Sequence, residues 1–294
     1  MISYLSEDAI WDYDTYLFDA DGVLWRDTEA IPGAAAFIQL LLEKGKRVLV
    51  VTNNATKTTP QYVMKLHGLG FGLLTEQNII SPNVTLVDYL RRNPNLIEKD
   101  VYLLGNHAIA DTLLHELGVH CFGHGPDPMP EDAMFLSSID VSRPASCVVV
   151  GHDPHFSYLK LMKAANYLRV PGTGFIITNE DNTIVMPDAD LVVPETGCIA
   201  AAIRTVVRPK EPVVLGKPSR QLGEYLKTNF SIDPKKTLMF GDRLDTDMKF
   251  ANSNGFDSCW MQTGIHKMED VKRAIDQKED QLIPKFTYSF HVHV

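Results

Sequence analysis

Two carboxylates stand two residues apart directly after a short apolar run. Asp19 and Asp21 follow the run 16–18 and precede Gly22. Residues two apart on an extended strand share a face, so both side chains could project from the strand end into one crevice. One carboxylate could attack phosphorus while the other serves as general acid and base. A strand end followed by an Asp-Gly turn has the same pattern, so the pair alone does not decide its function.

Hydroxyl and amide side chains follow a second apolar run. Thr52, Asn53 and Asn54 come directly after residues 48–51. As hydrogen-bond donors they could hold the equatorial oxygens of a phosphoryl group during its transfer. They could also cap a helix that we expect to begin near residue 58, because Thr and Asn are common at that position.

A lysine follows a third run. Lys217 lies between Gly216 and Pro218, after the valine-rich residues 213–215. A lysine ammonium is a compact point charge that suits a phosphate group. Most lysines are nevertheless solvated, so this residue gains weight only from the other motifs.

The densest acidic cluster follows a fourth run. Asp242, Asp245 and Asp247 come after the apolar residues 238–240. Such a cluster repels itself unless a cation or solvent relieves the charge, and oxygen ligands suit Mg²⁺. Arg243 could instead pair with one of the three carboxylates, which would make the cluster a solvated turn.

All four groups depend on the ends of strands for their position. Short apolar runs alternate with segments of helical period, which predicts a parallel sheet covered by helices. In open α/β sheets, ligands bind outside the carboxyl ends of the strands. We therefore expect a doubly wound, Rossmann-like α/β core in which the four strand ends meet at one small site.

A long segment interrupts this core. About 160 residues separate the second run from the third, which is too many for one crossover connection. The segment has its own alternation of strand-like and helical stretches. We expect a core at residues 1–97 and 211–294, with an inserted α/β cap domain at 98–210.

Taken in order, the four groups resemble the signature motifs of the haloacid dehalogenase superfamily of phosphatases. The matching residues are Asp19-Ala20-Asp21-Gly22 for the nucleophile and acid/base motif, Thr52-Asn53 for the phosphate-binding strand end, Lys217 for the motif lysine, and Asp242 with Asp247 for the acidic metal motif. The resemblance covers nearly the whole chain. The insert looks like the α/β cap of the family's second type.

This resemblance implies a mechanism and a cofactor. Mg²⁺ would be bound by the Asp19 carboxylate, the Asp21 backbone carbonyl and Asp242, with Asp247 in support. Asp19 would take the phosphoryl group, while Asp21 would protonate the leaving alkoxide and then activate water. Dehalogenases of the superfamily lack the second aspartate, so Asp21 favours a phosphatase. The cap would close over small phosphate esters.

A closer resemblance is to the subgroup that contains eukaryotic phosphoglycolate phosphatase, pyridoxal phosphatase and 4-nitrophenylphosphatases. It rests on three further segments, 151–158, 178–182 and 216–219. The pyridoxal branch carries a histidine in a cap loop that corresponds to residues 182–187, where this chain has none. A phosphoglycolate-like substrate is therefore favoured, while pyridoxal phosphate or a phosphoprotein remains an alternative. The tail 288–294 replaces the helical ending that the resemblance leads us to expect, which leaves the last core element open.

Composition restricts the partners. The 294 residues are 45% hydrophobic and 22% charged, with a formal net charge of −9, which offers no broad attraction to nucleic acid or anionic lipid. We find neither an export signal nor a run long enough to span a membrane. Four widely spaced cysteines fit a reduced, cytoplasmic protein. The resemblance also implies a homodimer formed through the cap.

Two other classes of protein remain possible from the residues alone. A regulatory phosphoacceptor also carries phosphate on an aspartate at a strand end, but it has no need of Asp21. A metal-binding scaffold without turnover would keep the acids and tolerate the loss of Lys217. Release of inorganic phosphate from 4-nitrophenyl phosphate separates both from an enzyme.

Overall fold

The computed structural model describes residues 2–129, 139–184 and 191–290. Contacts between residues divide the chain into two compact units, and the chain passes between them more than once. The first unit comprises Met1–Thr52, Thr59–Ile80 and Lys217–Val294, and the second comprises Asn53–Thr58 and Ser81–Gly216.

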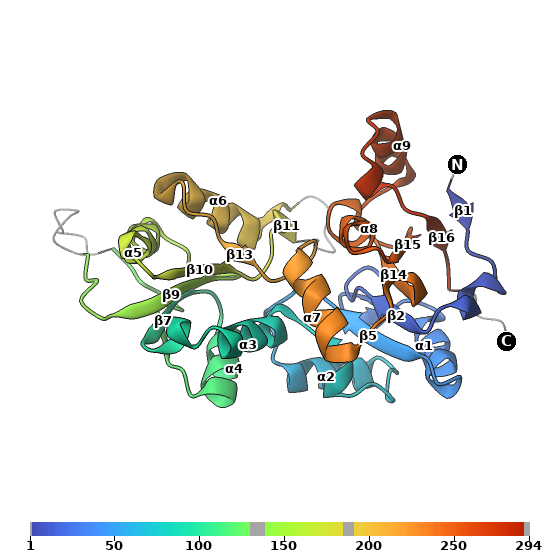
Figure 1. Ribbon diagram of the computed structural model, residues 1–294, viewed down its shortest axis with the longest axis horizontal. Coiled ribbons are helices and arrows are strands. Elements are labelled where there is room, and N and C mark those ends of the chain that lie inside the picture. Colours follow the sequence, from blue (N-terminus) through green and yellow to red (C-terminus); the bar gives the residue numbers. More distant parts are fainter. Residues whose placement is uncertain (1, 130–138, 185–190, 291–294) are drawn as a thin grey trace. The chain divides into compact units, whose positions relative to one another are not determined.

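A parallel sheet forms the centre of the first unit (Figure 1). Among the described residues it has seven strands, and all neighbouring pairs are parallel. In spatial order they are β1 (Ser3–Tyr4), β16 (Phe286–Tyr288), β15 (Asp257–Met261), β14 (Thr237–Gly241), β2 (Thr15–Phe18), β5 (Arg47–Val51) and β6 (Ile79–Ile80). The three strands that precede Asp19, Thr52 and Asp242 are therefore neighbours, and their carboxyl ends lie at the same edge.

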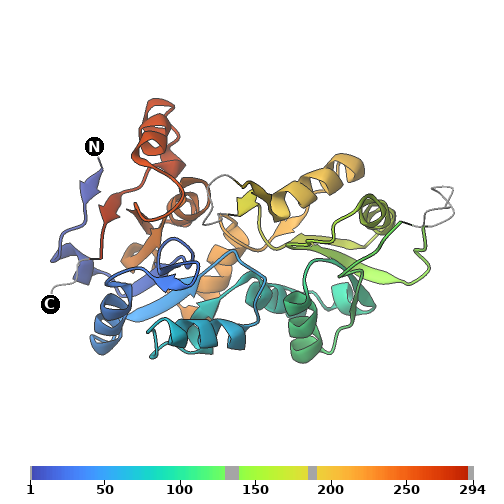
Figure 2. The same ribbon diagram turned by 180° about the vertical axis from the view of Figure 1, so that it is seen from behind.

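Helices cover both faces of this sheet because its strands are apolar on both sides (Figures 1 and 2). Phe18 and its neighbours pack against α1 (Ala34–Glu43) and α2 (Thr59–Gly68). Leu17 points to the opposite face, where α7 (Arg220–Phe230) and α8 (Lys249–Asn254) lie. The other elements of the unit are a hairpin of β3 (Trp25–Arg26) and β4 (Glu29–Ala30), a π-helical turn η5 (Leu244–Met248), α9 (Met268–Asp276), and the 3₁₀ turns η1 (Ala9–Asp12), η2 (Glu76–Asn78), η4 (Pro234–Lys236) and η6 (Asp280–Leu282).

The second unit has its own parallel sheet. In the described part of the chain this sheet has five strands, in the spatial order β13 (Val213–Val214), β10 (Gly174–Ile177), β9 (Ala145–Val150), β7 (Asp100–Leu104) and β8 (Cys121–Phe122). One face is covered by α3 (Pro82–Arg92) and α4 (His107–Leu117), and the other by α5 (Tyr158–Arg169) and α6 (Thr196–Val207). A 3₁₀ turn η3 (Pro94–Ile97) and a small antiparallel pair, β11 (Thr183–Ile184) and β12 (Val193–Pro194), complete it.

The fold confirms the predicted class and corrects one strand. Both units have the α/β architecture with parallel sheets that we expected. We placed residues 213–215 in the core, but β13 pairs with β10 in the second unit, where Ile176 lies opposite Val213. A short valine-rich strand carries no local signal of which sheet it joins, since long-range pairing decides this.

The boundaries of the second unit fall outside the cap limits of 98 and 210 that the sequence suggested. Helix α3 packs on α4, and the segment 53–58 belongs to the same compact unit. The connections between the two units therefore lie next to residues 52, 58, 80 and 216. Two of the predicted motifs, at Thr52-Asn53 and at Lys217, stand directly at these connections.

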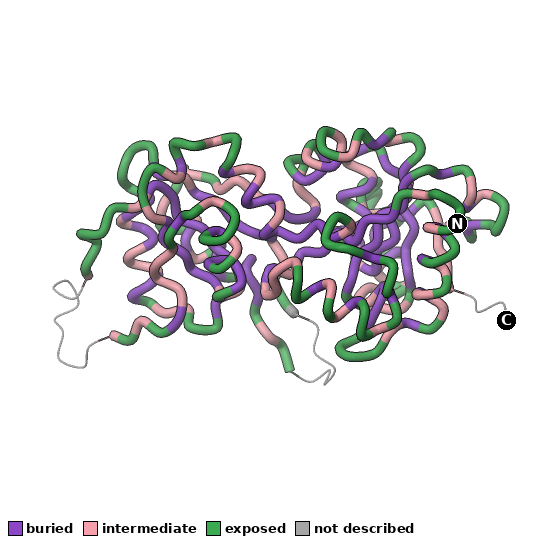
Figure 3. Tube along the Cα trace, turned by 90° about the horizontal axis from the view of Figure 1, so that it is seen from below, coloured by how far each residue is buried: buried purple, intermediate pink, exposed green. Residues whose placement is uncertain are grey.

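The last described element of the chain is a strand rather than a helix. Strand β16 lies between β1 and β15 and extends the first sheet. Figure 3 shows that buried stretches lie inside each unit, while many of the outer turns are exposed. No helix in the described ranges is long and apolar enough to cross a bilayer. Residues 291–294 and 185–187, on which predictions about the tail and the cap loop rest, lie outside the described part.

Candidate active site

Asp19 begins the turn that follows β2. Its backbone N–H donates to the Phe240 carbonyl at 2.9 Å, so the nucleophile motif is tied to the neighbouring strand β14. Gly22 follows with a φ of +87°, a conformation that side chains with a Cβ rarely adopt. A Cβ at this position would also lie 2.9 Å from the Asp242 carboxyl. The glycine therefore allows the turn to pass close to the acidic cluster.

A buried ammonium joins two of the predicted carboxylates. Lys217 Nζ lies 2.5 Å from Asp19 Oδ1 and 2.7 Å from Asp247 Oδ1. Its side chain is only 1% exposed. Burial by itself lowers the pKa of Lys217, but the two carboxylates outweigh this and raise the pKa above its ordinary value. The lysine therefore stays charged between them.

The acidic motif separates into members with different surroundings. Asp247 Oδ2 accepts the backbone N–H groups of Asp242 and Arg243, both at 3.1 Å, so its position is fixed. Asp242 Oδ2 accepts the Ile265 N–H at 2.8 Å. Asp242 Oδ1 is buried and has no hydrogen-bond partner among the described residues.

Asp245 does not join this group. Its side chain is 49% exposed and pairs with Arg243, whose Nη2 lies 2.9 Å from Oδ2. The sequence left open which carboxylate Arg243 would neutralise. In the structure Arg243 pairs with Asp245, so its guanidinium does not neutralise the buried carboxylates Asp242 and Asp247.

The buried carboxylates are crowded. Burial, followed by the charges of Asp19 and Asp247, raises the pKa of Asp242 well above its ordinary value. Burial also raises the pKa of Asp19, against the opposing effect of Lys217. It raises the pKa of Asp247 to about 6. One lysine therefore does not fully compensate the three acids.

This donor set fits a divalent cation. Asp19, Asp242 and Asp247 each offer a carboxylate oxygen, and these oxygens lie within 4.8 Å of one another. In the described part of the chain they form the one such group of three or more acids, histidines or cysteines. Carboxylate oxygens are the ligands that Mg²⁺ takes in proteins. The partnerless Oδ1 of Asp242 is the position at which a cation would relieve both the charge and the missing contact.

Thr52 and the two asparagines lie in different surroundings. Thr52 belongs to the first unit, where its side chain hydrogen-bonds with Tyr62. Asn53 belongs to the second unit, where its Nδ2 donates to Asp181 Oδ2 at 3.1 Å. Asn54 Oδ1 accepts from the backbone N–H of Thr56 at 2.9 Å and thus supports a local turn.

Asp21 differs from the buried carboxylates in its exposure. Its side chain is 51% exposed, whereas that of Asp19 is 11% exposed. The indole Nε1–H of Trp25 donates to Asp21 Oδ1 at 2.7 Å. Of the two carboxylates of the Asp-x-Asp motif, one is thus fixed by an ion pair and the other is open to solvent.

Comparison with known proteins assigns the family. Models of haloacid dehalogenase-like hydrolases match residues 16–120 and 214–287. Human glycerol-3-phosphate phosphatase is 35% identical over 289 residues, which are 94% of this chain and 88% of that protein. The chain belongs to the haloacid dehalogenase-like hydrolases. Relatives such as human glycerol-3-phosphate phosphatase are named as phosphatases, and this chain is a phosphatase that acts on small phosphate esters.

Further proteins are similar to most of this chain. Phosphoglycolate phosphatase 2 of Arabidopsis thaliana is 35% identical over 86% of this chain and 83% of its own length. A NipSnap protein of Caenorhabditis elegans is 46% identical over 83% of this chain, which spans 47% of that protein. Among solved structures, the p-nitrophenyl phosphatase of Archaeoglobus fulgidus has a TM-score of 0.77 and 25% identity, covering 95% of this chain and 96% of that one.

The sequence did not single out every residue of this hydrolase site. The loop after β15 places Ile265 on Asp242, and a Cβ at Gly264 would lie 1.8 Å from Asp242 Oδ2. The sequence does contain a signal for this loop. Residues 262–264 follow the apolar end of β15 and mark a fifth strand end beside the four that carry the motifs. Trp25 was missed because a tryptophan near an apolar run predicts only core.

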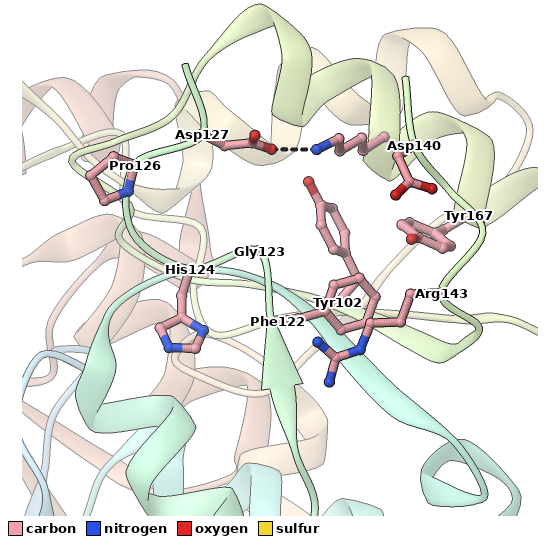
Figure 4. Close-up of a pocket in the computed structure, with 10 residues that line it drawn as sticks. Tyr102, Phe122, Gly123, His124, Pro126, Asp127, Asp140, Arg143 and Tyr167 are labelled. Atoms are coloured by element: carbon pink, nitrogen blue, oxygen red, sulfur yellow. Dashed lines mark hydrogen bonds and ion pairs between the residues drawn. The ribbon is translucent and has the colours of Figure 1, made fainter. Parts of the chain in front are cut away.

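A cavity of about 310 Å³ lies in the second unit of the hydrolase, away from these residues in the chain (Figure 4). Its two cations are already engaged, as Lys163 Nζ lies 2.7 Å from Asp127 and Arg143 Nη2 lies 2.6 Å from Asp100. The Arg143 guanidinium also lies over the Phe122 ring, with its Cζ 4.3 Å from the ring centre. Neither of these two cations is therefore left unpaired to hold a phosphate group in this cavity.

Replacing Lys217 by Met should destabilise the hydrolase. The substitution leaves Asp19 and Asp247 buried without their cation, which typically costs about 3–5 kcal/mol in the free energy of unfolding. Carboxyls with a raised pKa bind more protons when folded than when unfolded, so low pH favours the folded state. The loss should thus shrink as the pH falls from about 8 to about 5. Denaturant unfolding in chelator measures it, and a loss that does not depend on pH would contradict the pairing.

Proposed function

We propose that this phosphatase is a Mg²⁺-dependent phosphomonoester hydrolase that works through an aspartyl phosphate on Asp19. One observation carries the proposal. Three buried carboxylates, Asp19, Asp242 and Asp247, lie close together, and a single buried ammonium pairs with the first and the last of them. One oxygen of Asp242 has no partner among the described residues. An arrangement with excess buried negative charge suits a cation and the phosphoryl group that the cation would bind.

Asp19 is the nucleophile in this proposal. Its carboxylate attacks phosphorus in line, and the bond from phosphorus to the ester oxygen breaks with its electron pair on that oxygen. Asp21 gives its proton to this leaving oxygen. Water then attacks the phosphorus of the aspartyl phosphate and passes a proton to Asp21, while the Asp19 carboxylate leaves. The products are an alcohol and inorganic phosphate, and both aspartates return to their starting states.

The cofactor would be held by the Asp19 carboxylate, the Asp21 backbone carbonyl and Asp242. When bound, Mg²⁺ supplies positive charge to the phosphoryl oxygens. Asp247 supports the site by holding Lys217 Nζ at 2.7 Å, because its other oxygen is engaged by two backbone N–H groups. Lys217 in turn favours the charged form of Asp19 and orients it through its contact of 2.5 Å.

Thr52, Asn53 and Asn54 are the proposed phosphate-binding residues. The Thr52 hydroxyl and the amide groups at positions 53 and 54 follow β5, the strand next to β2. Donors of this kind stabilise charge on the equatorial oxygens as phosphorus is transferred.

The substrate is proposed to be a small primary alkyl phosphate, with a phosphoglycolate-like ester favoured. Relatives named for glycerol 3-phosphate and phosphoglycolate, both 35% identical, support this class. Pyridoxal phosphate and phosphoproteins, the alternatives that the sequence resemblance leaves, are tested beside it. Phosphate release from these esters and from 4-nitrophenyl phosphate, with and without Mg²⁺, tests the function. No release from any of them with Mg²⁺ present would overturn the proposal.

Asp21→Asn should slow the phosphorylation of Asp19 by alkyl phosphates more than by 4-nitrophenyl phosphate. A nitrophenolate leaves with little protonation, whereas an alkoxide needs the acid, and general acids contribute about 10²–10⁴-fold. Asp21 also activates water in the second step, so steady-state rates should fall for every substrate. Rapid-quench measurement of the first turnover isolates the effect. Equal slowing of that step by both esters would remove Asp21 from the role of acid.

Homodimerisation through the cap and a cytoplasmic location complete the proposal. Leu191 and Val192 of the second unit are 61% and 74% exposed, which supplies apolar surface for association. The four cysteines, Cys121, Cys147, Cys198 and Cys259, are free thiols, which supports a reducing compartment.

A further inference from the structure

The general acid proposed above has an unusual degree of freedom for a catalytic group. The Asp21 side chain is 51% exposed, so packing does not fix its orientation. Asp19, in contrast, is buried and held by Lys217. A proton donor must nevertheless lie within hydrogen-bond distance of the leaving oxygen, at about 2.6–3.2 Å. Some other contact has to orient the Asp21 carboxylate.

Trp25 supplies that contact. Its indole Nε1–H donates to Asp21 Oδ1 at 2.7 Å, from a side chain that is fully buried. The backbone of the same turn fixes Trp25, because its carbonyl accepts the Gly22 N–H at 2.7 Å and its N–H donates to the Ala20 carbonyl at 3.2 Å. A rigid donor thus faces a carboxylate that is otherwise exposed.

A cation covers the same pair. Lys65, on helix α2, places its Nζ 4.4 Å from the centre of the Trp25 ring and 4.0 Å from Asp21 Oδ1. An ammonium over an indole face is a favourable arrangement, and its charge also attracts the carboxylate. Trp25 and Lys65 therefore both act on the same oxygen of Asp21.

We propose that Trp25 is the positioning residue for the general acid Asp21, and that Lys65 stabilises both side chains through its contacts with the indole ring and the carboxylate. This inference rests on the role proposed for Asp21 above. An indole N–H can only donate, so it engages Oδ1 as an acceptor and leaves Oδ2 for the proton transfer. Oδ2 has no hydrogen bond to any other described residue. Its proton passes to the leaving oxygen when the phosphorus–oxygen bond breaks, and the attacking water later returns one to it.

Kinetics of Trp25→Phe test the inference. The variant keeps a ring in the buried position and loses only the donor. We expect phosphorylation of Asp19 by phenyl phosphate to slow on the order of 10-fold, with much less slowing by 4-nitrophenyl phosphate and little change in KM. Trp11→Phe is the matched control, since Lys44 Nζ also lies over the Trp11 ring, at 4.8 Å, without a carboxylate in the pair.

The double variant Asp21→Asn/Trp25→Phe shows whether Trp25 acts through Asp21. If it does, the second substitution adds nothing to the leaving-group effect of Asp21→Asn. Additive effects would overturn the inference, as would a Trp25→Phe variant that behaves like Trp11→Phe. If Asp21→Asn itself has no leaving-group effect, the proposed acid role fails and the inference fails with it. If Asp21→Asn has that effect and Trp25→Phe does not, only the inference fails.

A spectroscopic measurement keeps the test valid if Trp25→Phe folds poorly. The indole N–H of Trp25 gives its own NMR signal, which Asp21→Asn should shift because the acceptor loses its charge. The indole signal of Trp11 should stay in place. An unchanged Trp25 signal in a folded Asp21→Asn protein would overturn the hydrogen bond on which the inference depends.

Discussion

We expect Asp19→Asn to abolish turnover, lowering kcat by at least about 10⁴-fold. The amide has nearly the shape of the carboxylate but is a poor nucleophile, so no aspartyl phosphate can form. The fold should persist, because Lys217 keeps its contact with Asp247 at 2.7 Å and one charge leaves a crowded cluster. Steady-state phosphate release measures the loss, and thermal unfolding should give an unchanged or higher Tm.

Asp14→Asn is the matched control for this experiment. Asp14 directly precedes the amino end of β2, its side chain is 71% exposed, and the same chemical change there should leave kcat unaltered. Trapping of labelled phosphate on the wild-type protein and its absence in Asp19→Asn complete the test. Substantial residual hydrolysis in Asp19→Asn, with Mg²⁺ saturating, would rule out the covalent route.

Removal of divalent cations should have the second largest effect. Chelator should reduce phosphate release to background, and added Mg²⁺ should restore it, because the carboxylates of Asp19, Asp242 and Asp247 would otherwise oppose an incoming phosphate. Asp242→Asn should raise the Mg²⁺ concentration for half-maximal activity by more than about 10-fold, since it weakens the oxygen that has no protein partner.

Asp245→Asn is the matched control for Asp242→Asn, because it removes a nearby negative charge that we do not expect to bind the metal. Asp245 belongs to the same acidic motif, but its carboxylate is half exposed and paired with Arg243. Its substitution should leave the Mg²⁺ dependence unchanged. Equal shifts for Asp242→Asn and Asp245→Asn would mean that general negative charge matters and that Asp242 holds no cation. Chelator-resistant turnover of the wild-type protein would remove the metal altogether.

Much of this site could be predicted because its residues stand at strand ends. The apolar runs before Asp19, Thr52 and Asp242 are strands of one parallel sheet, and neighbouring parallel strands present their carboxyl ends at one edge. Trp25 and Ile265 could not be predicted in the same way. Their contacts with Asp21 and Asp242 arise from the geometry of the loops, and single-sequence patterns do not specify which way a loop atom points.

By itself, the sequence determined the α/β class, the order of the four motifs and the presence of an inserted unit, since periodicity and spacing are local properties. The tertiary structure decided which strands pair and which side chains meet, because both depend on contacts between residues far apart in the chain. Strand β13 joined the second unit, and yet Lys217, three residues after it, reached Asp19 and Asp247 in the first. The tertiary structure also separated the members of the acidic motif. Asp245 is exposed and pairs with Arg243, whereas Asp242 and Asp247 are buried. Three aspartates of one motif acquired different pKa values and partners, because burial and neighbours, which only the folded chain provides, set the electrostatics of each carboxylate.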